Sequence, residues 1–285
     1  MRRLDKPHAM KMGALGIGRF FLLGTYLLFV LAPVYWMVIT AFKTDTEIVN
    51  VNELTYFPKQ FTLVNFISLF SQLKFGGFLQ NSIVLSTGTA IIVLLYAILG
   101  GYALARYKFR GKSAIILFFL ISQMIPGILV IIPLYIIFAR LGLINTTFVL
   151  LVLYVMGNTP FCVITMRSFF ERIPVSLEEA ARVDGCSRME ALVRVIIPVL
   201  FPGIVAVFIF AFTGAWNDLL AGIIFTSSQS KWTIPVGMKS LIGKYNVRWG
   251  ELMAGGTLAL LPTVIMFAFV QRYVVDGLTA GSVKG

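Results

Sequence analysis

Residues 78–104 read FLQNSIVLSTGTAIIVLLYAILGGYAL and contain no charged side chain. The hydrocarbon core of a bilayer is about 30 Å thick, and an α-helix of about 20 apolar residues crosses it. Lipid offers no partner to backbone amides, so only helices and closed barrels span membranes. The strands of a barrel would alternate between apolar and polar residues over short segments, which this stretch does not do. The stretch therefore predicts a transmembrane helix.

The rest of the chain repeats this pattern. Five further apolar runs of comparable length occupy residues 18–41, 114–138, 144–166, 196–225 and 252–274. Of the 285 residues, 58% are hydrophobic and only 13% are charged, and the mean hydropathy is +0.89. Soluble domains carry about 25% charged residues. The sequence predicts an all-α, polytopic membrane protein with six transmembrane helices. Its expected parts are an N-terminal tail (1–17), a transmembrane domain (18–275) and a C-terminal tail (276–285).

The basic side chains predict how the chain is oriented in the membrane. The net charge is +12, and the basic residues gather at the ends of the apolar runs rather than in a continuous stripe. This distribution argues against a nucleic-acid-binding surface. With the N-terminus inside, the inner segments hold 16 Lys and Arg residues and the outer segments hold 8. The excess of positive charge inside places both termini in the cytoplasm.

Several kinds of catalytic or metal site are not indicated by the sequence. Cys162 and Cys186 lack the spacing of a redox or metal-binding pair, and His8 is the single histidine. The triplet Gly111-Lys112-Ser113 matches the end of a nucleotide-binding P-loop, but Arg106 stands where the first glycine is required. We therefore expect that this chain binds no cofactor or metal and that it is not itself an enzyme. Any ATP and Mg²⁺ would be bound by a partner.

The polar inner loop at residues 173–194 separates the fourth and fifth predicted spans. It contains two Ser-x-x-Glu capping boxes, one from Ser176 to Glu179 and one from Ser187 to Glu190. Gly185 lies between them, where a residue with positive φ would end the first helix. We expect a helix, a sharp turn and a second helix on the cytoplasmic face.

Two interpretations of the first helix of this loop are open from the residues alone. Ala180 and Ala181 leave the helix thin, so that it would fit a groove of a partner protein. The alternative is an ordinary amphipathic inner loop without a partner. The adjacent Glu178 and Glu179 would point about 100° apart on a helix, so a shared acid–base site is not expected there.

The stretch Glu179-Ala180-Ala181-x-x-Asp184-Gly185, followed by Ile197-Pro198, resembles the EAA loop of ABC importer permeases. The sequence departs from that pattern in having Val195 and Ile197 where isoleucine and leucine are usual. In that family the loop is the coupling helix that sits in a cleft of the ATPase subunit. The resemblance assigns the coupling role to Glu179, Ala180, Ala181, Asp184 and Gly185.

Three further stretches are similar to the carbohydrate-uptake branch of these permeases, in particular to the smaller membrane subunit of maltose-type transporters. They are residues 61–66, residues 215–218 with 232–237, and residues 271–285. The resemblance covers nearly the whole chain. It implies a permease subunit in a bacterial plasma (inner) membrane that moves a carbohydrate. It also implies a second homologous permease, two copies of a P-loop ATPase and an extracytoplasmic carbohydrate-binding protein.

Polar residues within the apolar spans are candidates for the substrate pathway. Asp218 is the one carboxylate inside a span, and intramembrane charges usually face a cavity or a partner. With Trp216 and Asn217 it would offer a ring for stacking and polar groups for hydroxyls. Gln123 and Asn158 are weaker candidates. The competing interpretation, a structural hydrogen-bond network or a gate, is favoured by the sequence.

Two other classes of function are weighed against the importer. An ion-coupled secondary transporter would need intramembrane charges, for which Asp218 is the clear acidic candidate. A membrane-embedded enzyme would need a polar catalytic cluster, and the sequence contains no suitable His, Cys or carboxylate group of that kind.

Overall fold

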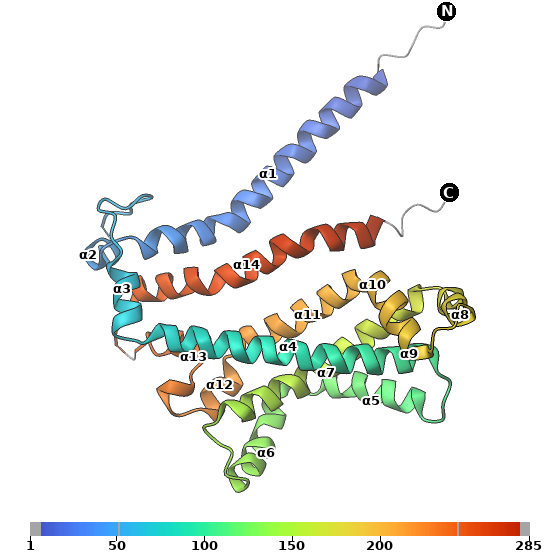
Figure 1. The fold of residues 1–285 in the computed structure, drawn as a ribbon. Helices are drawn as coiled ribbons and strands as arrows, with labels where there is room; N and C mark the ends of the chain where they lie inside the picture. Colours follow the sequence, from blue (N-terminus) through green and yellow to red (C-terminus); the bar gives the residue numbers. More distant parts are fainter. Residues whose placement is uncertain (1–6, 51, 244, 280–285) are drawn as a thin grey trace, which may run out of the picture. The chain divides into compact units, whose positions relative to one another are not determined.

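The computed structural model describes residues 7–50, 52–243 and 245–279, and side chains for residues 18–50, 52–243 and 245–271. Over these residues the chain is helical and contains no β-strand, as the sequence predicts. The contacts divide it into two compact units, Met1–Gln72 with Gly243–Leu258 and Leu73–Ile242 with Ala259–Gly285 (Figure 1). The outer residues of the two predicted tails, 1–6 and 280–285, lie outside the described part.

The first unit contains three helices and the beginning of a fourth. They are α1 (Pro7–Ala41), α2 (Asp45–Val49), α3 (Val64–Ser71) and the first turns of α14 (Trp249–Thr279). The helix α1 begins at Pro7, within the predicted tail, and its segment 18–41 is long and apolar enough to cross a membrane. The buried Asn65 joins α3 to the end of α1, because its amide donates to the carbonyls of Ala41 and Lys43 at 3.0 and 2.8 Å.

Three helices form the centre of the second unit: α4 (Phe75–Arg106), α7 (Thr147–Arg172) and α11 (Phe201–Trp216). The helix α4 covers the apolar stretch at 78–104 and confirms it as one continuous helix. It approaches α7 closely at Gly101, where an added Cβ would lie 2.9 Å from the backbone nitrogen of Arg167. Two short helices, η2 (Gln229–Lys231) and α13 (Ile234–Lys239), come later in the chain. The first residue of α13 is held to α4, because the Ser82 hydroxyl accepts the Ile234 amide at 2.8 Å.

The third predicted span, 114–138, is not a continuous helix. It consists of α5 (Lys112–Met124) and α6 (Gly127–Arg140), which are bent by 98° with respect to each other. Pro126 explains the break, since it has no amide hydrogen and disfavours helical backbone at the preceding residue. Ile125 accordingly adopts an extended conformation, with ψ of 120°. A second proline, Pro133, is accommodated inside α6.

The fifth predicted span, 196–225, is also interrupted. The chain passes through α9 (Arg188–Ala191), a π-helical turn (Leu192–Ile196) and α10 (Ile197–Val199) before α11 starts, and the bend at this junction is 80°. Residues 217–219 then separate α11 from α12 (Leu220–Phe225). Pro202 lacks the amide that would continue the hydrogen bonding across the bend. Four described helices are long and apolar enough to span a membrane, or up to six spans if each bent pair counts as one.

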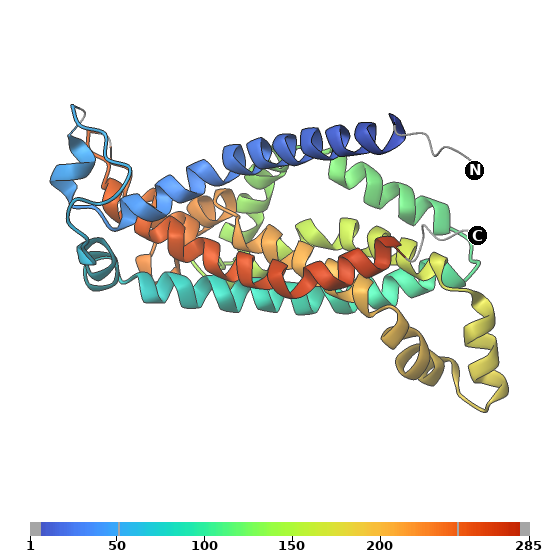
Figure 2. The ribbon, with the colours of Figure 1, turned by 90° about the horizontal axis from the view of Figure 1, so that it is seen from above.

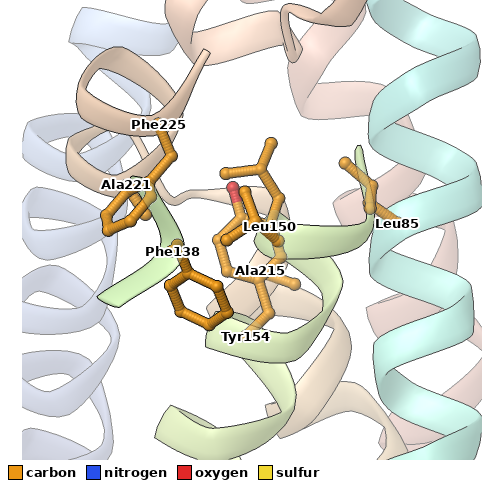
Figure 3. Close-up of a cluster of buried hydrophobic side chains, with 8 residues drawn as sticks. Leu85, Phe138, Leu150, Tyr154, Ala215, Ala221 and Phe225 are labelled. Carbon is orange, nitrogen blue, oxygen red and sulfur yellow. The ribbon is translucent and has the colours of Figure 1, made fainter. Parts of the chain in front are cut away.

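A hydrophobic cluster fixes α6 and α12 to the central helices of the second unit. Figure 3 shows Phe138 of α6 and Phe225 of α12 on the same side of α7 as Leu150 and Tyr154. The rings of Phe138 and Phe225 meet edge to face, with centroids 6.1 Å apart. Burial of such large apolar side chains contributes about 1.5–3 kcal/mol each in water. The cluster places the gap between α11 and α12 beside α7.

Candidate functional site

The inner loop adopts the helix–turn–helix arrangement that its sequence predicts. Its first helix is α8 (Val175–Val183), and its second begins at Arg188. Gly185 has a φ of +93°, a left-handed conformation that glycine adopts without steric cost. The amide of Cys186 donates to the Ala181 carbonyl at 3.0 Å and closes the turn after α8.

One of the two predicted capping boxes is present and the other is not. The amide of Ser187 donates to the Glu190 carboxylate at 2.9 Å, and the Ser187 hydroxyl accepts the Glu190 amide at 3.3 Å. The hydrogen bond that the Ser187 amide donates to the carboxylate, followed by the Ser187 side chain and the positive charge of Arg194, holds the pKa of Glu190 below its usual range. The prediction of a capping box at Ser176 was wrong, because α8 already begins at Val175 and its N-cap residue is Pro174. Ser176 is therefore the second residue of the helix and does not occupy its N-cap position.

Most of the predicted coupling residues lie on the exposed side of the loop. Glu179, Ala180, Asp184 and Gly185 are exposed, whereas Ala181 is buried against the rest of the unit. Figures 1 and 2 both show α8 and α9 at one end of the second unit, projecting past the bodies of α4 and α7. The exposed face also carries an apolar residue, Val183, whose side chain is 87% exposed. A thin helix with this exposed face is available to a partner.

The buried face of α8 holds Glu178, to which the sequence assigned no role in a site. Glu178 accepts a hydrogen bond from the hydroxyl of Tyr102 and forms an ion pair with Arg106, whose Nε lies 3.2 Å from Glu178 Oε2. The side chains of Arg106 and Glu178 are only 9% and 10% exposed. The signal available in the sequence was the 100° offset from Glu179, which sends one carboxylate inward if the other faces out.

The second candidate group, residues 216–218, surrounds the gap between α11 and α12. Asp218 Oδ1 accepts the amides of Ala221 and Gly222 at 3.0 and 3.3 Å, in the first turn of α12. The hydroxyl of Tyr154 on α7 donates to the same oxygen at 3.2 Å. Asp218 has no ion-pair partner among the described residues. Its geometry is that of a carboxylate which closes a helix break.

Trp216 is packed inside the unit in this conformation. Its side chain is 3% exposed, it stacks on Phe212 with a centroid separation of 5.4 Å, and its indole nitrogen donates to the Ala259 carbonyl at 3.2 Å. Its ring is therefore not open for stacking on a sugar. Asn217 is exposed. The arrangement of Trp216 and Asp218 favours the structural interpretation and leaves Asn217 as the accessible polar group.

The two weaker pathway candidates differ in their surroundings. Asn158 on α7 is half-buried, donates to the Tyr154 carbonyl at 2.8 Å, and occupies the space where a side chain at Gly214 would lie. It is thus packed against α11, close to the Tyr154–Asp218 contact. Gln123 is exposed and donates to the Phe119 carbonyl of its own helix at 3.3 Å. The structure places Asn158 between α7 and α11, at Gly214, whereas Gln123 is exposed on α5.

Comparison with known proteins identifies the family of the chain. Residues 97–279, which include α7, α8 and α11, match the family described as "Binding-protein-dependent transport system inner membrane component". The chain belongs to this family. It is therefore a permease component of an ABC-type importer, and this assignment replaces the alternative of an ion-coupled secondary transporter.

Individual members of the permease family resemble the chain over nearly its full length. It is 36% identical to the Escherichia coli inner membrane ABC transporter permease protein YcjP over 94% of this chain and 96% of that protein. It is also 36% identical to the diacetylchitobiose uptake system permease protein DasC of Streptomyces coelicolor over 89% of this chain and 91% of that protein. Among solved structures, a chain of a bacterial ABC transporter that imports alginate has the same fold, with a TM-score of 0.79, 21% identity and coverage of 96% and 99%.

Proposed function

We propose that this chain is the membrane subunit of an ATP-driven importer of oligosaccharides or related sugars. In this proposal it pairs with a second permease, two ATPase subunits that bind ATP and Mg²⁺, and an extracytoplasmic sugar-binding protein. Both termini lie in the cytoplasm. The observation that supports the coupling role is the projecting loop at α8, where Glu179, Ala180, Asp184 and Gly185 of the EAA pattern are exposed.

The proposed movement is a displacement of α8 by the ATPase. Glu179 and Asp184 are exposed on the projecting loop and would pair with polar groups at the rim of a cleft, while Ala180 and the exposed Val183 would enter its apolar floor. Nucleotide binding shifts the permease between inward-open and outward-open states only if the ATPase contacts α8 differently in the two states.

A sugar as substrate is supported by a relative rather than by a pocket in this chain. DasC, which is 36% identical to it, is described as a component of a diacetylchitobiose uptake system. In the second unit, the exposed side chains of Asn217 and Gln123 can form hydrogen bonds with the hydroxyl groups of a sugar. Their role as pathway residues, with Trp216, Asp218 and Asn158 as supports of the surrounding helices, is part of the proposal.

The first experiment is purification of the tagged chain from native membranes in mild detergent. A P-loop ATPase and a second permease are expected to accompany it, and the assembly is expected to take up an oligosaccharide into liposomes only with ATP. Diacetylchitobiose and maltodextrins are the first probes. Uptake by the chain alone on an ion gradient would refute the proposal.

Substitution of one exposed residue tests the assignment of α8. Glu179→Lys is expected to reduce ATP-dependent uptake strongly or to release the ATPase, while membrane insertion is retained. The matched control is Glu171→Lys on α7, another exposed glutamate that lies just before the loop. Equal uptake by the Glu179→Lys and wild-type assemblies would remove α8 from the coupling role.

A further inference from the structure

The buried ion pair between Glu178 of α8 and Arg106 of α4 is not needed for α8 to present an exposed docking surface. We infer that Glu178, Arg106 and Tyr102 form a direct link that carries movement of α8 into α4. In this role Glu178 is a positioning residue: it contacts neither nucleotide nor sugar. The inference rests on the proposed function, since it takes α8 to be the helix that the ATPase moves.

The contacts of the link tie the end of α4 to the end of α7 and to α8, which lie about 70 residues further along the chain. Glu178 receives the Tyr102 hydroxyl on one oxygen and the Arg106 guanidinium on the other, so both of its oxygens are held by α4. Arg106 also donates from Nη2 to the Ile173 carbonyl, at the end of α7, at 2.9 Å. One guanidinium therefore bridges the end of α7, α8 and the last residue of α4.

Burial makes this connection strong and specific in its geometry. The two charged side chains are about nine-tenths buried, and the Tyr102 ring packs edge to face on Phe170 of α7 with centroids 5.5 Å apart. A buried charge that loses its partner is costly, so α8 cannot separate from α4 without leaving Arg106 or Glu178 unpaired. Displacement of α8 is therefore expected to take the end of α4 with it.

The helix α4 is suited to carry such a displacement across the membrane. It runs without interruption from Phe75 to Arg106, and it is in close contact with α7 at Gly101, where no side chain would fit. Close packing of this kind transmits strain rather than absorbing it. At its other end, the Ser82 hydroxyl of α4 accepts the Ile234 amide of α13.

The route along the main chain is less direct. From α8 the chain passes the turn at Gly185, the short α9, a π-helical turn and the 80° bend before it reaches α11. π-Helical turns and bends of this size are local departures from helical hydrogen bonding and yield more readily than a continuous helix. On its other side α8 follows α7 after only Ile173 and Pro174, and the hydrogen bond from Arg106 to the Ile173 carbonyl ties this junction to α4 as well. Toward α11, the side-chain link to α4 thus supplies a stiff connection and the main chain a compliant one.

The test uses the complete transporter in liposomes, with the oligosaccharide that most stimulates ATP hydrolysis by the wild type. Glu178→Gln keeps the size of the side chain and removes its charge, and Tyr102→Phe removes one hydroxyl. For Glu178→Gln, sugar carried per ATP hydrolysed is expected to fall about fivefold or more, as for loss of a typical coupling between sites. Tyr102→Phe is expected to lower the same ratio to a smaller extent, while ATP hydrolysis continues in both variants.

The matched control is Glu171→Gln, which removes an ion pair with Arg167 at 2.8 Å from an exposed part of α7. Its ratio of sugar to ATP is expected to equal that of the wild type. An unchanged ratio in Glu178→Gln, or an equal fall of uptake and hydrolysis, would overturn the link. If Glu178→Gln does not assemble, Tyr102→Phe decides by the same criterion. Failure of the wild type itself to couple uptake to ATP would instead reject the proposed function, and the link with it.

Discussion

Glu178 and Asp218 are two carboxylates that each accept a hydrogen bond from a tyrosine, yet they act on different scales. Glu178 is paired with an arginine of another helix, and its contacts join α8 to α4. Asp218 accepts hydrogen bonds from amides three and four residues further along its own chain, and among the described residues Tyr154 is its one partner from another helix. The difference shows that an acidic residue near an apolar span can either connect helices or repair a local break.

The surroundings of each carboxylate explain its role. At Glu178 the polar groups come from side chains, whose positions depend on the packing of three segments, so the contact responds to movement between them. At Asp218 the donors are mainly backbone amides freed by the gap between α11 and α12, which need an acceptor because such groups are costly when buried. We therefore expect substitutions at the first site to affect coupling and global stability, and those at the second to act locally.

The largest effect is expected from Arg106→Met, which leaves Glu178 buried without a cation. Removing one partner of a buried ion pair typically costs about 3–5 kcal/mol. The free energy of unfolding in mixed micelles, followed by tryptophan fluorescence, measures this loss. The double variant Arg106→Met with Glu178→Leu is expected to recover most of it, because neither charge is then left unpaired. A small loss in the single variant would mean that water reaches Glu178, and the contrast with Asp218 would disappear.

A smaller effect is expected at Asp218, where two variants sharpen the contrast. Asp218→Ala leaves two amides of α12 and the Tyr154 hydroxyl without their acceptor, at a cost of about 1–3 kcal/mol. Asp218→Asn keeps an acceptor oxygen and is expected to cost much less. The same unfolding measurement distinguishes them, with sugar uptake as a second readout. An equally large loss in both variants, or loss of uptake in Asp218→Asn alone, would show that the charge itself is needed.

The smallest effect concerns a third carboxylate, Glu190, which accepts the Ser187 amide at the surface. Because its pKa is lowered in the folded protein, the stability it contributes is present above the ordinary pKa of a glutamate and is lost as the pH falls through the lowered value. Hydrogen exchange of the α9 amides, corrected for intrinsic rates, is expected to show a difference between wild type and Glu190→Gln at neutral pH. This difference should vanish in acid, and a difference that persists there would exclude the capping carboxylate as its cause.

The sequence was sufficient for the helical fold, the position of the apolar segments and the helix–turn–helix at residues 173–194, because apolar length and capping residues act locally. The Ser187 capping box and the turn at Gly185 were predictable for the same reason. The sharp bends near Pro126 and Pro202 were not predicted, since a proline in an apolar run is compatible with either a kink or a sharp bend. The partnership of Glu178 with Arg106 was not predictable, because it depends on which face of α8 packs inward. Likewise the burial of Trp216 is set by its tertiary contacts with Phe212 and Ala259.

The sharp bend between α5 and α6 has a consequence for insertion into the bilayer. Around Ile125 and Pro126 the last carbonyls of one helix and the first amides of the next lack intrahelical partners, and hydrocarbon cannot supply them. This corner of the chain is therefore excluded from the lipid-facing perimeter. Its backbone groups must be solvated by water or covered by a neighbouring subunit.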